Sequence, residues 1–481
     1  MRPILFALAL LAVPSLALAS SPPIADAGPD PSVYARDTEI LNGSATSPDA
    51  TPIIGWSSVV VDAPSGAVYR LQTPDQSRAS LSCSTPSMKE DAVARLTGQE
   101  RVVRAEELML AFAERTGVGA SGPGRRYLWT DAFAVANFLG LVRETGEKHY
   151  RDLALQLIEK VHGDLGCHRK DEPREGRLGS ATEEHPTLGG LRIGKPLPER
   201  RADERMDPRR EWDRDGQYFH YLTKWMQALD LTARVTGQPV YNRWARELAA
   251  TAYEAFSYVG PGSVRRMYWK MSIDLSRPLV PSMGQHDPLD GYVSVLQLRE
   301  TAKELGDLEG PQLADEVASF EAMIDPRGLP TDDPLGIGGL LVDACRLEQL
   351  MRRGVEDRHD LVPRLLEASL LGLRSYVAGG ELEEPASRRL AFRELGLAIG
   401  LHAVELMADA AKSGAFAGNE AARQRLEALR HQVSLAAAIE QFWLIEEHRQ
   451  QPTWREHSDI NEVMLATSLA PQGFLVLPPV R

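Results

Sequence analysis

The sequence predicts a mainly helical protein, a toroid of six helical hairpins, with a small β-sandwich-like module ahead of it. From Met88 onward Glu, Arg, Leu and Ala dominate, and apolar residues recur at the spacing of one helix face. Short turns containing Gly separate pairs of helices of similar length. A polar or charged cluster opens every second helix, which gives six helix starts of one kind.

The hairpins follow one another along the chain and form two rings. The predicted pairs, inner helix first, are 131–144 with 148–164, 217–235 with 240–256, 289–306 with 311–323, 335–353 with 359–377, and 390–411 with 420–446. The last inner helix, 458–469, is expected to pair with the segment 90–116, which closes the ring. Antiparallel hairpins with short outer turns predict an (α/α)6 toroid whose inner helices all start at the same end.

Residues 211–229 are the stretch around which the chain is organised. An apolar stripe runs along one helix face here: Tyr218, Tyr221, Leu222, Trp225, Met226 and Leu229. Asp213 and Asp215 stand just ahead of it. A polar, aromatic cluster is therefore expected at the N-terminus of a buried helix.

Composition limits the classes of partner. The 481 residues are 43% hydrophobic, which can fill a sizeable core, and the formal net charge is −13. Nucleic-acid binders and membrane-surface proteins usually present a basic face, so neither partner is expected. A neutral or cationic small partner fits this charge more easily.

The N-terminus has the pattern of a signal peptide over residues 1–19. One basic residue, Arg2, precedes the apolar run 4–19, which closes on Ala17-Leu18-Ala19. The run is shorter than the roughly 20 residues of a membrane-spanning helix, although a membrane anchor is the alternative. The expectation is a secreted or periplasmic protein with no membrane insertion after signal cleavage.

Residues 22–85 differ in composition from the rest, with short β-branched runs separated by Gly, Pro, Asp and Ser. The Ala25-Asp26-Ala27-Gly28-Pro29-Asp30 opening, the segment 41–45 and Trp56 resemble a PKD repeat, an immunoglobulin-like module. The final two strands of such a repeat are missing, so the module is truncated, and the helical domain is expected over 88–481. A spacer without a binding role is the favoured interpretation.

Two insertions interrupt the helical pattern, and the cysteines are few. Residues 167–214 are dense in charged residues, Pro and Gly, with a core expected to be ordered at 185–195. Residues 266–275 alternate with period two, which predicts an edge strand or hairpin arm. Cys83, Cys167 and Cys345 are interpreted as structural or incidental, with a Cys83–Cys167 bridge left open.

The pattern of hairpins resembles the six-hairpin glycosidase-like superfamily, over about residues 90–470. That superfamily includes unsaturated glucuronyl hydrolases, several glycanases and, with related geometry, N-acylglucosamine epimerases. The resemblance implies an (α/α)6 toroid and an activity on carbohydrate. No catalytic signature of any one member family is present in the sequence.

The inner-helix starts are expected to meet at one cavity, where free N–H groups and helix dipoles favour carboxylates. Glycoside cleavage needs one protonated and one ionised carboxyl group, and crowding of acids separates their pKa values. We predict Asp215 and Asp287 as this pair, with Asp131 and His286 assisting. Helix capping is the competing role for each Asp. The same cavity is expected to include Asp290, Asp333, Arg393 and Glu394.

Aromatic and charged residues at the same helix starts are the candidates for substrate binding. The candidates are Trp129, Trp212, Tyr218 and Trp269 for stacking on sugar faces, Arg192 and Lys195 for a substrate carboxylate, and Asp213, His457 and Asp459 for hydrogen bonds. The aromatic residues could instead pack beneath the long insertion. His220 is expected to be a core histidine.

No metal and no cofactor are expected. No pair of histidines has the close helical spacing of a metal site. The run 117–122, Gly-Val-Gly-Ala-Ser-Gly, matches a dinucleotide fingerprint but lacks its strand–turn–helix context.

The leading hypothesis is an exported glycosidase-like hydrolase acting on a poly- or oligosaccharide, with uronate-containing glycans among the candidates. The alternatives are a non-catalytic carbohydrate-binding or scaffold toroid, and a sugar epimerase or lyase on the same fold.

Overall fold

The computed structural model describes residues 96–119, 124–355 and 360–480, together with the backbone of four short strands earlier in the chain. The chain divides into two compact units, Met1–Asp91 and Ala92–Arg481. In the first unit β1 (Ala9–Ala12) pairs antiparallel with β4 (Trp56–Val59), and β2 (Ile24–Asp26) with β3 (Ser44–Thr46). The signal peptide, the PKD-like module and Cys83 fall largely outside the described residues and stay predictions.

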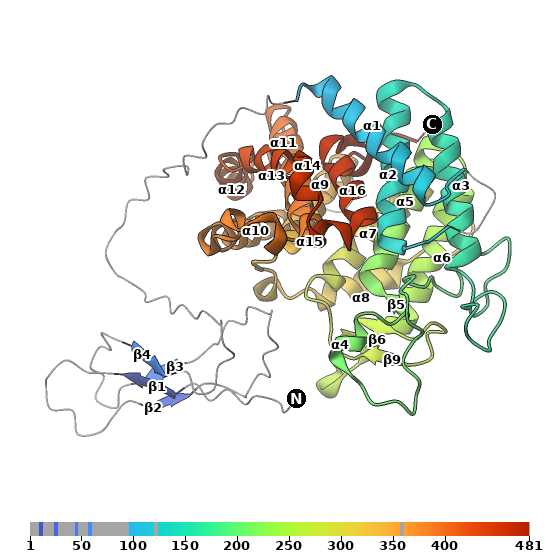
Figure 1. Ribbon diagram of the computed structural model, residues 1–481, viewed down its shortest axis with the longest axis horizontal. Helices are drawn as coiled ribbons and strands as arrows, with labels where there is room; N and C mark the ends of the chain where they lie inside the picture. The colour runs from blue at the N-terminus through green and yellow to red at the C-terminus, as the bar shows by residue number, and fades with distance from the viewer. Residues whose placement is uncertain are drawn as a thin grey trace, which may run out of the picture. The chain divides into compact units, whose positions relative to one another are not determined.

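Six helices of the second unit form a closed inner ring (Figure 1). In ring order they are α2 (Leu128–Thr145), α5 (Phe219–Thr236), α7 (Asp287–Leu305), α9 (Pro334–Arg352), α11 (Ala391–Lys412) and α16 (Ser458–Leu469). Each contacts the next, and α16 contacts α2, which closes the ring. The inner helices are buried on nearly all sides, as α2 is from Leu128 to Leu141, because they pack on both ring neighbours and on an outer helix.

The outer helices each cover one inner helix and bury a single face. They are α1 (Gly98–Arg115) on α16, α3 (His149–Asp164) on α2, α6 (Pro239–Phe256) on α5, α8 (Ala314–Met323) on α7, α10 (Leu361–Gly379) on α9, and α12 (Glu420–Arg430) with α13 (Ser434–Leu444) on α11. The predicted toroid of six hairpins is confirmed, including its closure by the first helix.

The prediction of a single helix over 420–446 is wrong. The backbone turns at 431–433, and the outer layer continues as α13. The first piece, α12, packs on α10 and α11, whereas α13 packs on α11 and α16. One straight helix could not pack on both α10 and α16. Two short helices, α14 (Glu446–Arg449) and α15 (Pro452–Arg455), then lead into α16.

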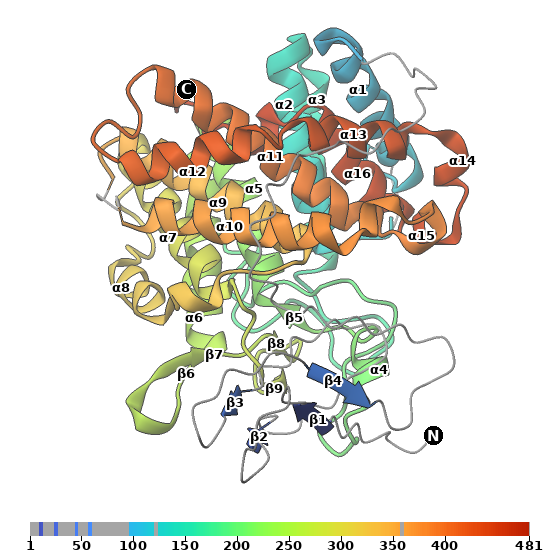
Figure 2. The same cartoon turned by 90° about the vertical axis from the view of Figure 1, so that its left-hand side faces the viewer.

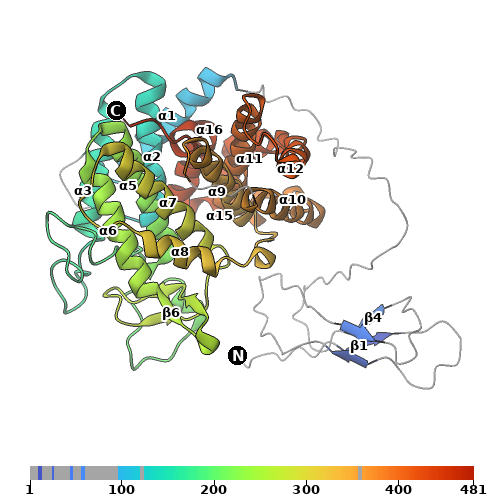
Figure 3. The same cartoon turned by 180° about the vertical axis from the view of Figure 1, so that it is seen from behind.

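The two insertions and the strands of the second unit lie at one end of the helical unit (Figure 2). There β5 (Gln217–Tyr218), β8 (Lys270–Met271) and β9 (Pro278–Val280) form an antiparallel sheet in that order. The hairpin of β6 (Ser257–Val259) and β7 (Arg265–Met267) contacts α6 and α8 (Figure 3). The predicted strand within 266–275 is therefore confirmed as parts of β7 and β8.

The first insertion, 167–214, is mostly loop and includes the short helix α4 (Pro208–Glu211). Single-turn 3-10 helices occur in other loops: η1 (Pro261–Ser263), η2 (Pro326–Gly328), η3 (Glu381–Glu383) and η4 (Ala386–Arg388). Cys167 and Cys345 are free thiols. Within the described ranges no helix is both long enough and apolar enough to cross a bilayer.

Candidate functional site

A cavity of about 730 Å³ opens at the end of the ring where the inner helices begin. Each inner helix contributes residues from its start: Asp131 from α2, His220 from α5, Asp287 from α7, Gly336 from α9, Arg393 from α11 and Asp459 from α16. The first insertion adds Lys195 and Trp212 to the wall, and the loop before β8 adds Trp269. Segments far apart in sequence therefore share one concave surface.

Most of the residues predicted for the site line this cavity. They are Asp131, His286 and Asp287 among the catalytic candidates, and Trp129, Lys195, Trp212, Asp213, Tyr218, Trp269, His457 and Asp459 among the binding candidates. Asp290, Asp333 and Arg393 line it as well. Glu394 does not, because its buried carboxylate is bound by Arg389 at 2.6 Å and by the indole N–H of Trp443 at 2.8 Å.

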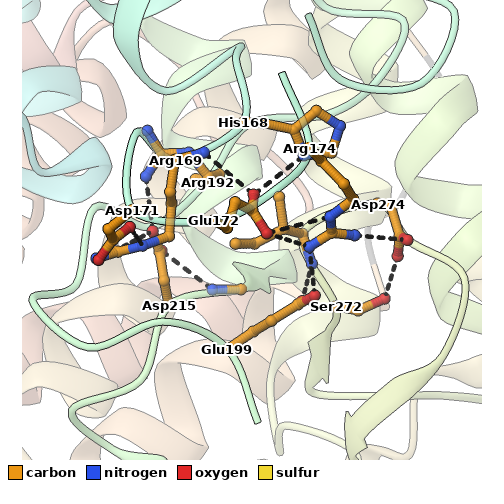
Figure 4. Close-up of polar contacts among 12 residues, drawn as sticks. His168, Arg169, Asp171, Glu172, Arg174, Arg192, Glu199, Asp215, Ser272 and Asp274 are labelled. Carbon is orange, nitrogen blue, oxygen red and sulfur yellow. Dashed lines mark hydrogen bonds and ion pairs between the residues drawn. The ribbon is translucent and has the colours of Figure 1, made fainter. Parts of the chain in front are cut away.

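Asp215 and Arg192 lie outside the cavity wall, in a buried ion cluster (Figure 4). Asp215 has no exposed surface and accepts hydrogen bonds from Arg192 at 2.6 Å and Arg169 at 3.2 Å. The backbone N–H of Gly194 also donates to it, at 3.0 Å. Since both of its oxygens are engaged, Asp215 cannot serve as a catalytic acid or base, and the predicted Asp215–Asp287 pair is corrected. Arg192 is occupied by the same cluster and cannot reach a substrate carboxylate.

Asp287 is the carboxyl group whose surroundings are best suited to proton transfer. It stands in the first turn of α7 and is only 5% exposed. Its Oδ2 atom has no hydrogen-bond partner among the described residues. Burial, and then repulsion by Asp290, raises the pKa of Asp287 to about 7. The group is therefore poised between its protonated and ionised forms near neutral pH.

Asp290, one turn further along α7, is held ionised. Burial alone would raise its pKa, but Lys224 and Arg346 keep the pKa of Asp290 below the ordinary value. Lys224 donates to it at 2.8 Å and the hydroxyl of Thr223 at 2.5 Å. Its fixed negative charge raises the pKa of Asp287 beside it, and also, after burial, that of Asp343, to about 6.

Asp131 combines a capping role with a perturbed pKa. Its carboxylate accepts a hydrogen bond from the backbone N–H of Tyr127 at 3.1 Å and lies 3.4 Å from Arg126. These bonds fix the first turn of α2, which is a structural role. Burial nevertheless raises the pKa of Asp131 to about 7. Both roles predicted for this residue therefore remain compatible with its position.

Three histidines face the cavity, and the prediction that His220 is a core residue is wrong. Burial lowers the pKa of His220 to about 4, and it also lowers the pKa values of His286 and His457. The Nδ1 atom of His220 accepts a hydrogen bond from the indole N–H of Trp269 at 3.3 Å and lies 4.0 Å from Asp287 Oδ1. The imidazole is therefore neutral and placed beside the carboxyl group. The signal in the sequence that His220 could face the cavity was its position two residues after Tyr218, in the first turn of a helix.

Aromatic rings form one wall of the cavity. The sequence did not show which of them pack in the wall and which are exposed to a ligand. Trp129 and Tyr218 are buried and pack against His220 and Tyr221. The hydroxyl groups of Tyr127 and Tyr221 are hydrogen bonded at 2.6 Å.

At the mouth, Trp212 is 51% exposed and meets Trp269 edge-on, with ring centroids 4.9 Å apart. Lys195 lies over the ring of Tyr127 at 5.5 Å. The buried rings shape the wall, and the exposed indole is the one free to stack on a ligand.

The described residues contain no group of three His, Cys, Asp or Glu side chains arranged to hold a metal ion. Carboxyl groups, imidazoles, cationic side chains and aromatic rings line the cavity.

Comparison with known proteins gives structural likenesses at low sequence identity. No protein-family profile matches the chain, and no curated protein matches its sequence. Its structure is similar to that of a GH76 α-mannanase from Bacteroides thetaiotaomicron, with 10% identity, 77% of this chain and 96% of that chain covered, and a TM-score of 0.45.

Two further solved structures are similar to a comparable degree. A D-mannose isomerase has 11% identity, with 77% and 97% of the two chains covered and a TM-score of 0.44. The cellobiose 2-epimerase from Spirochaeta thermophila has 13% identity, with 76% and 96% covered and a TM-score of 0.43. On its own helix contacts, the chain has an (α/α)6 toroid of six helical hairpins.

Proposed function

We propose that the cavity is the active site of a glycosidase-like enzyme that acts on a poly- or oligosaccharide. The observation that carries this proposal is Asp287: a buried carboxyl group with an unpartnered oxygen and a pKa raised to about 7, at the wall of an aromatic-lined cavity. A carboxyl group in this state can donate a proton to a glycosidic oxygen.

Asp213 is our candidate for the second carboxyl group in place of Asp215. It lies at the cavity mouth, beside the exposed Trp212, and its carboxylate forms no hydrogen bond or ion pair with the described residues. Asp131 is already bound by the start of its own helix, and Asp290 by Lys224 and Thr223. Uronate-containing glycans belong to the proposed substrates because Lys195 lines the wall without an ion pair among the described residues.

The test compares purified wild-type protein with Asp287→Asn and Asp213→Asn on a panel of neutral, amino-sugar and uronate-containing glycans, with new reducing ends as the readout. Each substitution is expected to lower the rate by a factor of about 10² to 10⁴. Asp152→Asn, at an exposed position on α3, is the matched control and should keep full activity. Full activity in Asp287→Asn would overturn the assignment.

A second function, sugar isomerisation or epimerisation, is favoured by the histidines. Three imidazoles with lowered pKa values face the cavity, and a neutral imidazole can accept a proton from a carbon beside a carbonyl group. Incubation with free aldoses in deuterium oxide distinguishes the two functions. Deuterium in recovered sugar, without new reducing ends, supports this second function, and binding without any product supports a non-catalytic toroid.

We also propose that the protein is exported, on the strength of the N-terminal pattern alone. Processing after residue 19 would be seen as a mature N-terminus at Ser20 in protein recovered outside the cytoplasm.

A further inference from the structure

The last residues of the chain run through the middle of the helical ring. The short helix α17 (Gln472–Leu475) contacts α2 and α9, which are opposite members of the six-membered ring. A segment that touches opposite helices must lie near the ring axis. The C-terminal segment, residues 471–478, therefore fills the interior of the toroid, beyond the cavity.

Side chains of two inner helices, α5 and α9, together with Arg353 directly after α9, donate hydrogen bonds to the backbone carbonyl groups of this segment. Gln227 donates to the carbonyl oxygen of Phe474 at 3.0 Å, and Gln349 to that of Leu475 at 2.8 Å. The bond from Arg353 to Leu477 is 2.6 Å long, and the bond from Arg234 to Pro478 is 3.1 Å long.

Gly473 packs so closely on Gly140 of α2 that a methyl group on either glycine would lie 2.7 Å from the Cα atom of the other. The segment is thus fixed in position.

Phe474 is the point at which this segment meets the cavity. Its ring stacks on Phe133 of α2, with centroids 4.4 Å apart and planes 18° apart, and both side chains line the cavity. The C-terminal segment therefore reaches the cavity from the interior of the ring, and Phe474 is part of the cavity wall.

The wall around Phe474 is apolar. Val342 of α9, Ile399 of α11 and Met464 of α16 line the cavity at this depth. They lie six to eight residues beyond the starts of their helices, a depth of roughly 9–12 Å at the rise of an α-helix. Asp343 is the carboxyl group that lines the cavity at this level among the described residues, and it is bound by Arg346 at 3.2 Å. We call Phe133, Val342, Ile399, Met464 and Phe474 the apolar floor.

The apolar floor lies beneath the polar mouth, and this contrast bears on the ligand. A sugar ring pressed against the floor would leave its hydroxyl groups without partners, which is unfavourable. An apolar group there would be removed from water, while an attached sugar stayed among the carboxylates and aromatic rings of the mouth.

We propose that the apolar floor is a subsite for an apolar substituent of a glycoside, and that Phe474 sets its depth. The sugar part of this proposal rests on the proposed function, whereas the apolar part rests on the floor alone. Phe474 then acts as a specificity-determining residue supplied by the end of the chain.

The test measures binding by calorimetry for methyl and phenyl β-D-glucopyranoside, the corresponding α-D-mannopyranosides, and benzyl alcohol as a probe without a sugar. Wild-type protein is expected to bind at least one phenyl glycoside about tenfold to a hundredfold more tightly than its methyl partner. Phe474→Trp and Val342→Phe, which fill the floor from different elements, should each abolish that preference without weakening the methyl glycoside.

Leu475→Ala is the matched control. It removes a buried side chain from the same segment but does not touch the cavity, so it should lower the melting temperature and keep the phenyl preference. Equal affinities for the methyl and phenyl glycosides would overturn the proposed apolar subsite and leave the proposed carbohydrate function standing. Binding of benzyl alcohol that Phe474→Trp abolishes, with no contribution from any sugar, would support the floor and overturn the carbohydrate function. Failure of every probe to bind would overturn both.

Discussion

Two aspartates near the inner-helix starts, Asp215 and Asp287, are both buried and yet have opposite surroundings. Asp215 accepts hydrogen bonds from two arginines and from backbone N–H groups, so its charge is compensated on every side. Asp287 keeps one oxygen without a partner and faces the ionised Asp290. The first arrangement stabilises the fold, and the second leaves a proton available for chemistry.

The raised pKa of Asp287 predicts a pH-dependent cost to stability. Because the folded protein keeps this proton up to about pH 7, and an unfolded aspartate loses it near pH 4, stability falls as pH rises between these values and stays lowered above them. Asp287→Asn should therefore be more stable than wild type at pH 8, with an upper bound of about 4 kcal/mol, and this gain should shrink towards pH 4. Urea unfolding at several pH values measures the difference, and a gain independent of pH would contradict the assignment.

Removal of Asp215 leaves two buried arginines without their shared carboxylate. We expect Asp215→Ala to reduce the free energy of unfolding by about 3–5 kcal/mol, since an uncompensated buried charge is costly. Asp213→Ala, at the exposed position two residues earlier, should change it by no more than about 0.5 kcal/mol. Equal effects of the two substitutions in urea unfolding would show that the cluster does not stabilise the fold.

At the scale of elements, α9 and α11 form the closest helix pair of the ring because glycines face each other. A methyl group on Gly338 would overlap the backbone of Gly396, and one on Gly400 would lie 2.6 Å from the Cα atom of Gly338. Backbones can approach this closely only where side chains are absent. The close approach brings the starts of both helices to the cavity wall.

Neighbouring glycines on α9 provide a matched pair of substitutions. Gly338→Ala should destabilise the protein by about 1–3 kcal/mol, because the helices must separate to admit the methyl group. Gly339→Ala, where nothing lies within 4 Å, should instead stabilise the protein by up to about 1 kcal/mol through helix propensity. Thermal unfolding of both variants measures this contrast, and a destabilised Gly339→Ala variant would argue against open space at that position.

The two insertions act as one element at the cavity mouth. Arg174 binds Glu172 and Glu199 of the first insertion at 2.6 Å each, and Asp274, between β8 and β9, at 2.8 Å (Figure 4). Arg169 also holds the carbonyl oxygen of Lys195 at 2.7 Å. These bonds fix the stretch that presents Lys195 and Trp212 to the cavity.

At the scale of the whole molecule, a cluster of charged side chains joins the first helix to α11 and α13. Arg101 of α1 binds Glu440 of α13 at 2.5 Å, and Glu440 also binds His402 of α11 at 2.8 Å. His402 is bonded to Glu405 as well, at 2.8 Å. Although burial lowers it, the pKa of His402 is raised overall by these two carboxylates.

This raised pKa makes the contribution of the Arg101–Glu440–His402 cluster to stability pH-dependent. A histidine whose pKa is higher in the folded protein contributes fully at pH below its ordinary value of about 6.5, and the contribution is lost as pH rises through the folded pKa. His402→Gln should therefore cost about 0.5–1.5 kcal/mol more at pH 5.5 than at pH 9. Urea unfolding at both pH values measures this cost. An equal cost at the two pH values would exclude an ion pair between protonated His402 and the carboxylates of Glu405 and Glu440.

The sequence by itself determined the toroid, because helix starts, turn glycines and the 3.6-residue apolar period are local features. It also indicated that the helix starts Asp131, Asp287 and Asp459 share one end of the ring, since antiparallel hairpins give the inner helices one direction. The long outer helix predicted over 420–446 was wrong because its break follows from the neighbours that it covers, which lie far away in sequence.

Only the tertiary structure decided which side chains face the cavity. Asp213 and Asp215 are two residues apart, and the contrast between an exposed and an ion-paired carboxylate depends on arginines from the insertion. His220 reaches the cavity because Trp269, from another segment, holds its ring. The position of Phe474 near the ring axis depends on the contacts of its segment with α2, α5 and α9. Burial and pairing are properties of the assembled chain, which is why a local sequence pattern could place the cavity but could not select the carboxyl group that we propose as its acid.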